Sequence, residues 1–289
     1  MKVIKNNIII INTHKKMESS PTYIFIDGSY FCFYRYHSLL TWWKNAFPEE
    51  LEVLKDPYQS EVFVNKFKKI FVETVKNLPK NLSINKNVKP IIVVGKDCKR
   101  SDIWRNELFP NYKGTRGLND SFMGGPFFKM VYDEQLFITG GATQTLKHPK
   151  LEADDCIALA VKHLLSSKPD CIIYIITSDK DYLQLAGERV NLFNLSYKKL
   201  TDQKSCTGNP ECDLFCKIVT GDPSDNIPSV FPKCGPKTAL KYYADRVLLE
   251  KKLGESEKYQ KQYELNKKII DFNEIPSHLA DEYMMSYNF

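Results

Sequence analysis

The stretch CIIYIITSDKDYLQL, residues 171–185, shows the pattern that decides the fold class. It begins with an unbroken apolar run, which is typical of a strand buried on both faces, and continues into a loop that carries Asp179 and Asp181. The same pattern, a short apolar strand that stops at an aspartate, occurs in TYIFID (22–27) and KPIIVVGKD (89–97). We therefore expect several strands of one buried sheet to end in carboxylates.

Helical segments separate these strands along the chain. VNKFKKIFVETVKNL (64–78) and LEADDCIALAVKHLL (151–165) have helical periodicity, and VNLFNL (190–195) predicts a further strand. Strands that are continuously apolar and alternate with helices favour parallel pairing. The sequence therefore predicts the α/β class, with a mostly parallel central sheet flanked by helices.

The composition is that of a folded chain. Its 289 residues, of which 43% are hydrophobic, suffice for one large domain or two modest ones. The net charge of +6 permits a nucleic-acid partner without demonstrating one. No apolar run is long enough for a transmembrane helix, and the isoleucine run in MKVIKNNIIIINTHKK (1–16) is not followed by a cleavage site. We expect a monomer with no membrane partner.

The cysteines agree with an intracellular protein. There are eight, and a chain of this length without a secretory signal is a poor candidate for a disulfide scaffold. Cys206, Cys212 and Cys216 lack the further pair or histidine that a zinc site needs, so we expect reduced thiols. The many Asn, Ile and Lys residues are typical of an AT-rich genome, such as that of a virus. We leave open whether this intracellular protein belongs to the cytoplasm or to the nucleus.

The chain divides into three segments. We expect residues 1–20 to form a flexible extension and residues 21–210 to form the core. From about residue 211 the pattern changes to helices around the Pro- and Gly-rich stretch GDPSDNIPSVFPKCGPKTA, so residues 211–289 predict a helical subdomain. Within it, residues 233–268 carry ten Lys and Arg against five Asp and Glu. Much of the positive charge therefore lies in this subdomain.

Nine carboxylates stand where strands end or where helices and turns begin. They are Asp27, Asp97, Glu152, Asp154, Asp155, Asp179, Asp181, Asp222 and Asp225. Each one alone is explained by ordinary turn or helix-start chemistry. Ligands bind beyond the carboxyl ends of parallel strands, and nine carboxylates gathered there would repel one another unless cations neutralised them. Oxygen ligands select Mg²⁺ or Mn²⁺, and two such ions about 4 Å apart are the usual arrangement for phosphodiester hydrolysis.

Basic residues near the second strand predict a phosphate-bearing substrate. The run contains Lys96, Lys99, Arg100, Arg105, Lys113 and Arg116, with Tyr112 beside Lys113. Basic groups bind phosphates, and aromatic rings stack on the bases of single strands. A solvated charged loop explains the run equally well when it is taken by itself.

Five motifs now combine into a resemblance. They are FIDGSYFCFYR (25–35), DIWRNELFPNYKGTR (102–116), LEADD (151–155), TSDKDYLQL (177–185) and GDPSDNIPSVFPKCGPKTA (221–239). In this order they resemble the flap endonuclease and 5′→3′ exonuclease family, over roughly residues 22–245. That family includes the 5′-nuclease domain of bacterial DNA polymerase I, phage exonucleases and eukaryotic flap endonucleases. The resemblance implies a PIN-like 5′-nuclease fold with a helical arch and a helix–three-turn–helix.

The resemblance also implies roles for single residues. The first metal site would draw on Asp27, Asp97, Glu152 and Asp154, and the second on Asp155, Asp179, Asp181, Asp222 and Asp225, with the division open because some acids bridge. Arg35, Arg105 and Lys113 would act near the scissile phosphate. Tyr112, Lys113 and Arg116 would stand at the base of the arch, about residues 113–150, which a single-stranded 5′ end passes through or under.

The Pro- and Gly-rich stretch resembles the family's helix–three-turn–helix. The resemblance implies a potassium ion held by backbone carbonyls beside duplex phosphates, with Lys233, Lys237 and Thr238 facing the duplex. The chain departs from the family at Lys233, which replaces a glycine of the turn. The loop after Asp97 is also slightly longer than in many relatives, so Asp102 stays an alternative to Asp97.

The resemblance implies a structure-specific 5′ nuclease that uses two Mg²⁺ or Mn²⁺ ions. Its substrate would be DNA with a 5′ flap, a nick or a free 5′ end, or an RNA–DNA hybrid. Two alternatives are a binder of branched nucleic acid that has lost catalysis and an α/β metal phosphatase. No sliding-clamp motif is evident in DFNEIPSHLADEYMMSYNF (271–289), so we expect a stand-alone nuclease and leave a polymerase or clamp partner open.

Overall fold

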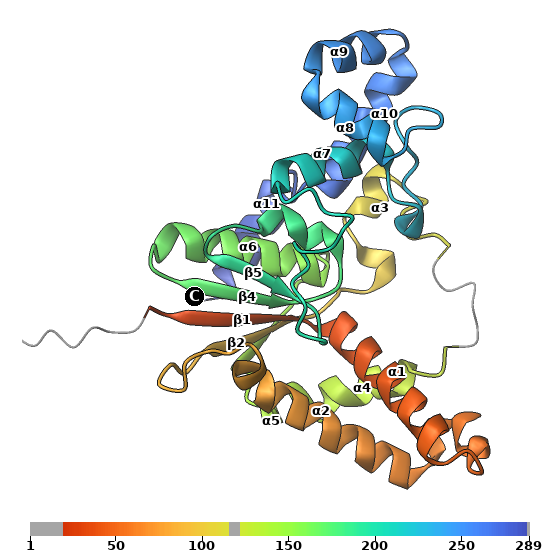
Figure 1. The fold of residues 1–289 in the computed structure, drawn as a ribbon, viewed down its shortest axis with the longest axis vertical. Coiled ribbons are helices and arrows are strands. Elements are labelled where there is room, and N and C mark those ends of the chain that lie inside the picture. The colour runs from red at the N-terminus through yellow and green to blue at the C-terminus, as the bar shows by residue number, and fades with distance from the viewer. Residues whose placement is uncertain (1–19, 116–121, 288–289) are drawn as a thin grey trace, which may run out of the picture.

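The computed structural model describes residues 20–115 and 122–287, so most of the predicted extension and Arg116 lie outside the described residues. The described part contains a parallel five-stranded sheet in the order β3-β2-β1-β4-β5, which confirms the predicted class (Figure 1). The strands are β1 (Thr22–Asp27), β2 (Ile91–Gly95), β3 (Gln144–Leu146), β4 (Ile172–Ile176) and β5 (Val190–Phe193). Within these residues, no helix is long and apolar enough to cross a bilayer.

The central strand β1 connects two hydrophobic layers. Its side chains alternate, so that Tyr23 and Phe25 face one layer while Ile24 and Ile26 face the other. The first layer contains α6 (Ala153–Ser167) and α11 (Ser277–Met285). The second contains α1 (Gly28–Ala46), α2 (Glu61–Asn81), α4 (Gly125–Asp133) and α5 (Leu136–Thr139), which lie on the opposite side of the sheet in Figure 1. Burial of both faces explains why the strands are continuously apolar.

Strand register places the functional carboxylates at one edge. Asp27 at the end of β1 pairs with Gly95 at the end of β2, and Ile26 pairs with Ile176 at the end of β4. The segments that follow these residues therefore leave the sheet side by side. The short helices at or near this edge are α3 (Arg105–Leu108) and the 3₁₀ helices η3 (Arg100–Asp102), η4 (Lys180–Leu185) and η5 (Pro223–Asp225).

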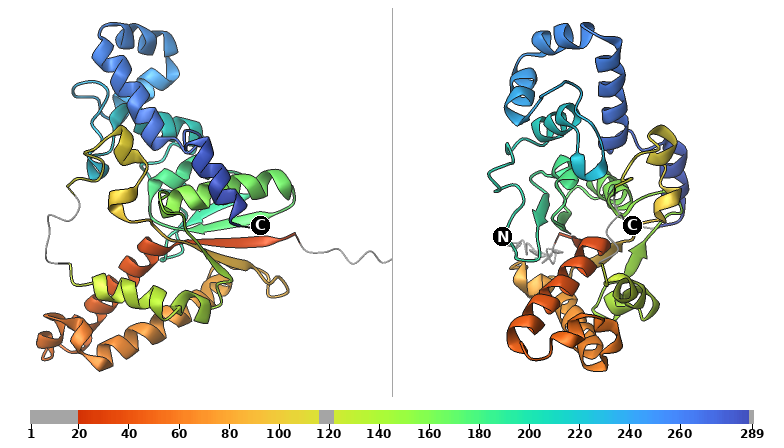
Figure 2. Two further views of the ribbon diagram at one scale, coloured as in Figure 1. Left: turned by 180° about the vertical axis from the view of Figure 1, so that it is seen from behind. Right: turned by 90° about the vertical axis from the view of Figure 1, so that its right-hand side faces the viewer.

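A helical body stands beyond this edge of the sheet. It consists of α7 (Pro210–Thr220), α8 (Pro236–Ala244), α9 (Arg246–Gly254) and α10 (Glu257–Ile270). Phe215, Phe231, Tyr242 and Leu249 form its own hydrophobic core. Figure 2 shows α10 running back from this body towards the sheet, where α11 packs against α6. The helical region expected after residue 211 is therefore present.

The segment predicted as an arch differs in part from the expectation. From residue 125 onward it forms α4, α5 and the edge strand β3. Phe127 and Val131 of α4 are fully buried against α1 and α2, because the apolar face of this short helix needs a partner. Only the part before α4 remains for an arch, and residues 116–121 of it lie outside the described residues.

The remaining short elements are peripheral. The excursion expected after α1 contains two 3₁₀ helices, η1 (Leu51–Leu54) and η2 (Pro57–Gln59). All eight cysteines are free thiols, as the composition predicts, and Cys32, Cys156, Cys171 and Cys212 are buried.

Candidate metal centre

A cleft of ≈ 1080 Å³ opens at the carboxyl edge of the sheet. Seven of the nine predicted carboxylates line it, namely Asp27, Asp97, Glu152, Asp154, Asp179, Asp181 and Asp222. They come from the ends of β1, β2 and β4, from the start of α6 and from the turn after α7. The convergence inferred from the alternating pattern is therefore present in the structure.

Local hydrogen bonds hold Asp27 and Asp97 at the cleft. Asp27 caps α1 by accepting from the Tyr30 backbone N–H at 3.0 Å, and its other oxygen accepts from the Thr177 hydroxyl at 3.1 Å. Asp97 accepts from the Ser29 hydroxyl at 2.5 Å and from the Ala153 backbone N–H at 2.8 Å. These bonds connect β1, β2 and the first turn of α6. By contrast, the alternative Asp102 accepts from Ser101 on η3 and does not line the cleft.

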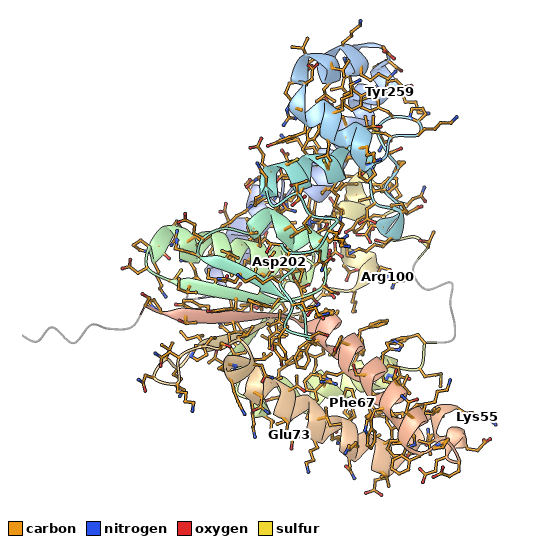
Figure 3. All side chains as sticks on the ribbon, viewed as in Figure 1. Lys55, Phe67, Glu73, Arg100, Asp202 and Tyr259 are labelled. Carbon is orange, nitrogen blue, oxygen red and sulfur yellow. The ribbon has the colours of Figure 1, made fainter. Side chains whose placement is uncertain are left out.

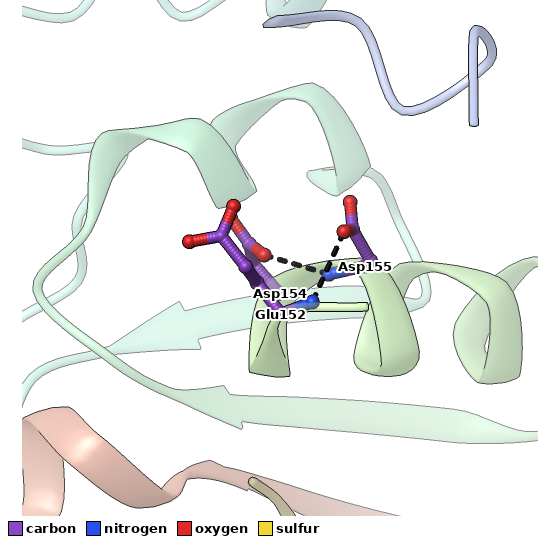
Figure 4. Close-up of side chains that lie close together, drawn as sticks. All are labelled: Glu152, Asp154 and Asp155. Carbon is purple, nitrogen blue, oxygen red and sulfur yellow. Dashed lines mark hydrogen bonds between the residues drawn. The ribbon is translucent and has the colours of Figure 1, made fainter. Parts of the chain in front are cut away.

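The start of α6 supplies three acids from four consecutive residues (Figure 4). One oxygen from each of Glu152, Asp154 and Asp155 lies within 4.8 Å of the others. Asp155 closes a capping box by accepting from the Glu152 backbone N–H at 3.2 Å. The cap accounts for the position of Asp155, while Glu152 and Asp154 face the cleft.

Four of the cleft carboxylates have no cation of their own. No described lysine or arginine forms an ion pair with Asp27, Asp97, Asp154 or Asp179. Burial, together with the charges of Asp97 and Asp179, raises the pKa of Asp27 to about 7. Burial and the neighbouring Asp155 and Glu152 raise the pKa of Asp154 well above its ordinary value. An excess of oxygen ligands that resist ionisation fits a divalent cation.

The other three cleft carboxylates, Glu152, Asp181 and Asp222, are each paired with a lysine. Lys113 pairs with Glu152 at 2.5 Å, and Lys217 pairs with both Asp181 and Asp222, the latter at 2.8 Å. Burial opposes ionisation of Glu152, but Lys113 and Arg105 outweigh it and lower the pKa of that carboxyl. Burial is likewise outweighed at Asp222, where Lys217 lowers the pKa to about 2. The cleft carboxylates therefore form two groups. Glu152, Asp181 and Asp222 are paired with lysines, and the other four, called the uncompensated carboxylates below, are not paired with a described lysine or arginine.

Arg105 is predicted to act near the scissile phosphate. Its side chain is 2% exposed, and it does not line the cleft. Its guanidinium donates to both oxygens of Asp155, at 2.7 and 2.8 Å, to Glu152 at 2.9 Å and to the Ile269 carbonyl at 2.7 Å. Because every one of these bonds is buried, Arg105 holds the start of α6 in place, and its action near the scissile phosphate stays a prediction.

Four further predicted residues lie elsewhere than expected. Asp155 and Asp225 are buried and do not line the cleft, although one oxygen of Asp155 lies within 4.8 Å of oxygens of Glu152 and Asp154. Tyr112 is 5% exposed and donates its hydroxyl to Glu152 at 3.0 Å, so its ring is buried in this structure and its contact with nucleic acid stays a prediction. Arg35 donates to the Thr74 hydroxyl of α2 at 3.1 Å and does not line the cleft. In each case the side chain contacts other residues inside the protein.

Lysines and arginines that do line the cleft include three that were not assigned a role. These are Arg100, Lys180 and Lys217, in addition to the predicted Lys113. Figure 3 shows Arg100 beside the carboxyl edge of the sheet, below the helical body. Arg100 is part of the basic run, whereas Lys217 carried no signal, because its partner Asp181 is 36 residues away in the sequence. The residues predicted to face a duplex lie in the helical body. Lys233, in the turn before α8, and Lys237, in the first turn of α8, are exposed, and Thr238 is half-buried.

The turn before α8 has a left-handed residue where the family has a glycine. Lys233 has a φ of 56°, which lies in the left-handed region that favours glycine. Lys233 is therefore a strained residue in this turn.

Comparisons with known proteins agree with the fold and show the family. The family described as 5′-3′ exonuclease, N-terminal resolvase-like domain, matches residues 22–209. A 5′-3′ exonuclease of Buchnera aphidicola subsp. Schizaphis graminum is 32% identical over 178 residues, which cover 58% of this chain and 56% of that protein. The ribonuclease H of Enterobacteria phage T4 is 30% identical over 249 residues, which cover 76% of this chain and 79% of that protein.

The fold is also found among solved structures. The T5 5′-exonuclease with bound zinc has a TM-score of 0.64 at 18% identity, and the match covers 92% of this chain and 97% of that one. The fold and the acidic cleft define a member of the nuclease class, and the chain belongs to the 5′-3′ exonuclease family. It spans little more than half the length of the Buchnera relatives that it matches.

Proposed function

We propose that this chain is an Mg²⁺-dependent, structure-specific 5′ nuclease that hydrolyses DNA phosphodiester bonds near 5′ ends and branch points. The observation that carries the proposal is the group of four carboxylates that form no ion pair with a described lysine or arginine, in an open cleft that is also lined by basic side chains. Membership of the 5′-3′ exonuclease family supports the reaction class. Mn²⁺ would serve the same oxygen ligands.

The uncompensated carboxylates would hold one cation, and Asp181 and Asp222 would contribute to a second position. Two bound ions would supply an activated water and stabilise the leaving oxygen. The chain's own residues orient the substrate: the Lys113 ammonium lines the cleft and is held there by Glu152. Lys113 would contact a phosphate that enters the cleft. Arg105, which is buried, donates to Glu152 and holds that carboxylate in place. Arg105 is therefore a positioning residue in this proposal.

The proposed substrate is DNA with a 5′ flap, a nick or a free 5′ end, or an RNA–DNA hybrid. One relative in the comparisons is named ribonuclease H, and one structural neighbour is a T5 flap endonuclease with DNA and metal ions. Lys233, Lys237 and Thr238 would face the duplex at the start of α8, where a potassium ion would bind backbone carbonyls. We propose that the protein acts as a monomer on such substrates.

Cleavage of three 5′-labelled substrates, a flap, a nicked duplex and a blunt duplex, tests the proposal. Each is incubated with Mg²⁺ or with EDTA. Asp154→Asn removes one carboxylate of the uncompensated group, and we expect it to slow cleavage at least a hundredfold or so while leaving flap binding near the wild-type level. The matched control is Asp102→Asn, which alters an exposed aspartate outside the cleft.

Three results would contradict the proposal. Cleavage by Asp154→Asn at the wild-type rate removes that residue from the mechanism. Loss of activity in Asp102→Asn alone would instead assign the first site to the alternative aspartate. A wild-type protein that binds the flap but never cuts it is the non-catalytic binder of branched nucleic acid.

A further inference from the structure

The ammonium of Lys217 stands where two cleft carboxylates meet. Lys217 belongs to α7, and its side chain is 20% exposed. It contacts Asp181, which follows β4, and Asp222, which follows α7, the latter at 2.8 Å. One positive charge thus links two acids that are 41 residues apart in the chain. Asp222 is kept in place independently by accepting from the Ser224 backbone N–H and hydroxyl, at 2.8 and 2.6 Å.

The ion pairs of Lys217 distinguish Asp181 and Asp222 from the four cleft carboxylates that pair with no described lysine or arginine. No described lysine or arginine forms an ion pair with Asp27, Asp97, Asp154 or Asp179, so an added cation would displace no described cationic side chain there. At Asp181 and Asp222 an added cation would face the ammonium at contact distance, and two positive charges so close repel strongly in a partly buried site. The ammonium therefore has to leave before a cation can use both carboxylates.

The lysine side chain is suited to such a movement. Its charge is carried by a flexible four-carbon stem with freely rotating donors, unlike the planar guanidinium of arginine. Lys217 lines an open cleft, so its side chain has room to move. A phosphate in the cleft would offer it a new partner.

We infer that Lys217 is an internal counter-cation that competes with a second divalent cation for Asp181 and Asp222. In the absence of nucleic acid it holds this position closed, so that the free protein binds one divalent cation tightly and a second one weakly. Lys217 is a positioning residue in this inference, because it acts through the two carboxylates. The inference rests on the proposed metal-dependent function and adds an order in which the cations enter.

Calorimetric titration of the metal-free full chain with Mn²⁺, without nucleic acid, tests the inference. Lys217→Met keeps an unbranched side chain, shorter by one atom, and removes its charge. We expect the second binding step of this variant to tighten by about tenfold or more, because the competing charge is gone. Lys217→Arg keeps the charge and the contact with both acids, so its titration should resemble that of the wild type.

The matched control is Lys180→Met. Lys180 lines the same cleft, but its ammonium donates to the Ser205 hydroxyl and not to a carboxylate. This variant removes the same charge from the cleft as a whole, so an equal gain in Mn²⁺ affinity would show a general electrostatic effect and overturn the inference. An unchanged second step in Lys217→Met would also overturn it. Thermal melting of each variant establishes that it is folded.

A double variant locates the gained site. Adding Asp222→Asn to Lys217→Met should abolish the gain, and a gain that persists would place the new cation elsewhere. These titrations need no cleavage, so the two proposals can fail separately. A wild type that cuts DNA beside an unaltered Lys217→Met titration refutes only the counter-cation, whereas a gain in Mn²⁺ binding by a protein that never cuts DNA refutes only the nuclease.

Discussion

Asp27 combines two roles in one side chain. It ends β1, caps α1 and lines the cleft, where burial and the nearby Asp97 and Asp179 raise its pKa to about 7 from an ordinary value of 3.8. The folded protein therefore keeps a proton on Asp27 at pH values where the unfolded chain has lost it. Stability contributed by this proton is present at low pH and is lost as the pH rises through about 7.

We expect the metal-free protein to melt several degrees lower at pH 8 than at pH 5, measured in EDTA. Asp27→Asn should flatten this dependence, because an asparagine still caps α1 but does not ionise. Mg²⁺ should raise the melting temperature of the wild type at pH 8, where the carboxylates are charged, and have less effect on the variant. A variant with the same pH slope as the wild type would show that other groups govern it.

The turn before α8 shows how an element tolerates an unfavourable residue. Lys233 occupies a left-handed backbone position, in which the side chain crowds its own carbonyl group. The turn keeps its shape because Phe231 before it and Ala239 after it are buried in the core of the helical body. The strain at Lys233 is thus held by packing on both sides.

Lys233→Gly should stabilise the protein by about 0.5–1 kcal/mol, because glycine adopts this φ without strain, although it gains entropy in the unfolded chain. Lys233→Ala is the matched control, since it removes the same charge but keeps the Cβ atom. Urea denaturation of both variants measures the difference. Equal stability of the glycine and alanine variants would show that the backbone at this position is relaxed.

At the scale of the whole molecule, α8 and α2 lie on opposite sides of the sheet edge (Figure 1). Figure 3 places Tyr259 in the upper body and Phe67 in the lower layer. The upper body carries the basic segment 233–268, whose ten Lys and Arg residues exceed its five Asp and Glu residues. A duplex held by this body would bring one of its ends to the cleft below.

Lys237→Ala and Lys241→Ala should each weaken duplex binding several-fold and lower the dependence of log K on log salt by about one unit, because each lysine neutralises one phosphate. Lys76→Ala on the exposed face of α2 is the control and should leave both quantities unchanged. Binding measured across a salt series decides the matter. A loss of affinity in the control as large as in the α8 variants would place the duplex elsewhere.

Much of the fold could be predicted from local patterns. The apolar runs at 22–27, 172–176 and 190–193 are strands, and the periodic segment 64–78 lies within α2. These elements could be predicted because a strand buried on both faces has a continuous apolar run, and a helix buried on one side has apolar residues at helical spacing. The same locality placed Asp27, Asp97 and Asp179 at one edge. The segment after residue 125 was harder to predict, because a short apolar helix has the same sequence pattern whether it belongs to an arch or packs in a core.

The sequence by itself determined the class of fold, the family and nine candidate acids, of which seven line the cleft, since these depend on strand ends and on motifs of a few residues. Only the tertiary structure decided which acids are free. Arg105 reaches Glu152 and Asp155 from 47 and 50 residues away, and Lys217 reaches Asp181 from 36 residues away. Such pairs form because the fold buries the partners together, and an unpaired charge is costly there. A motif therefore names the carboxylates, while long-range packing decides which of them a cation can use.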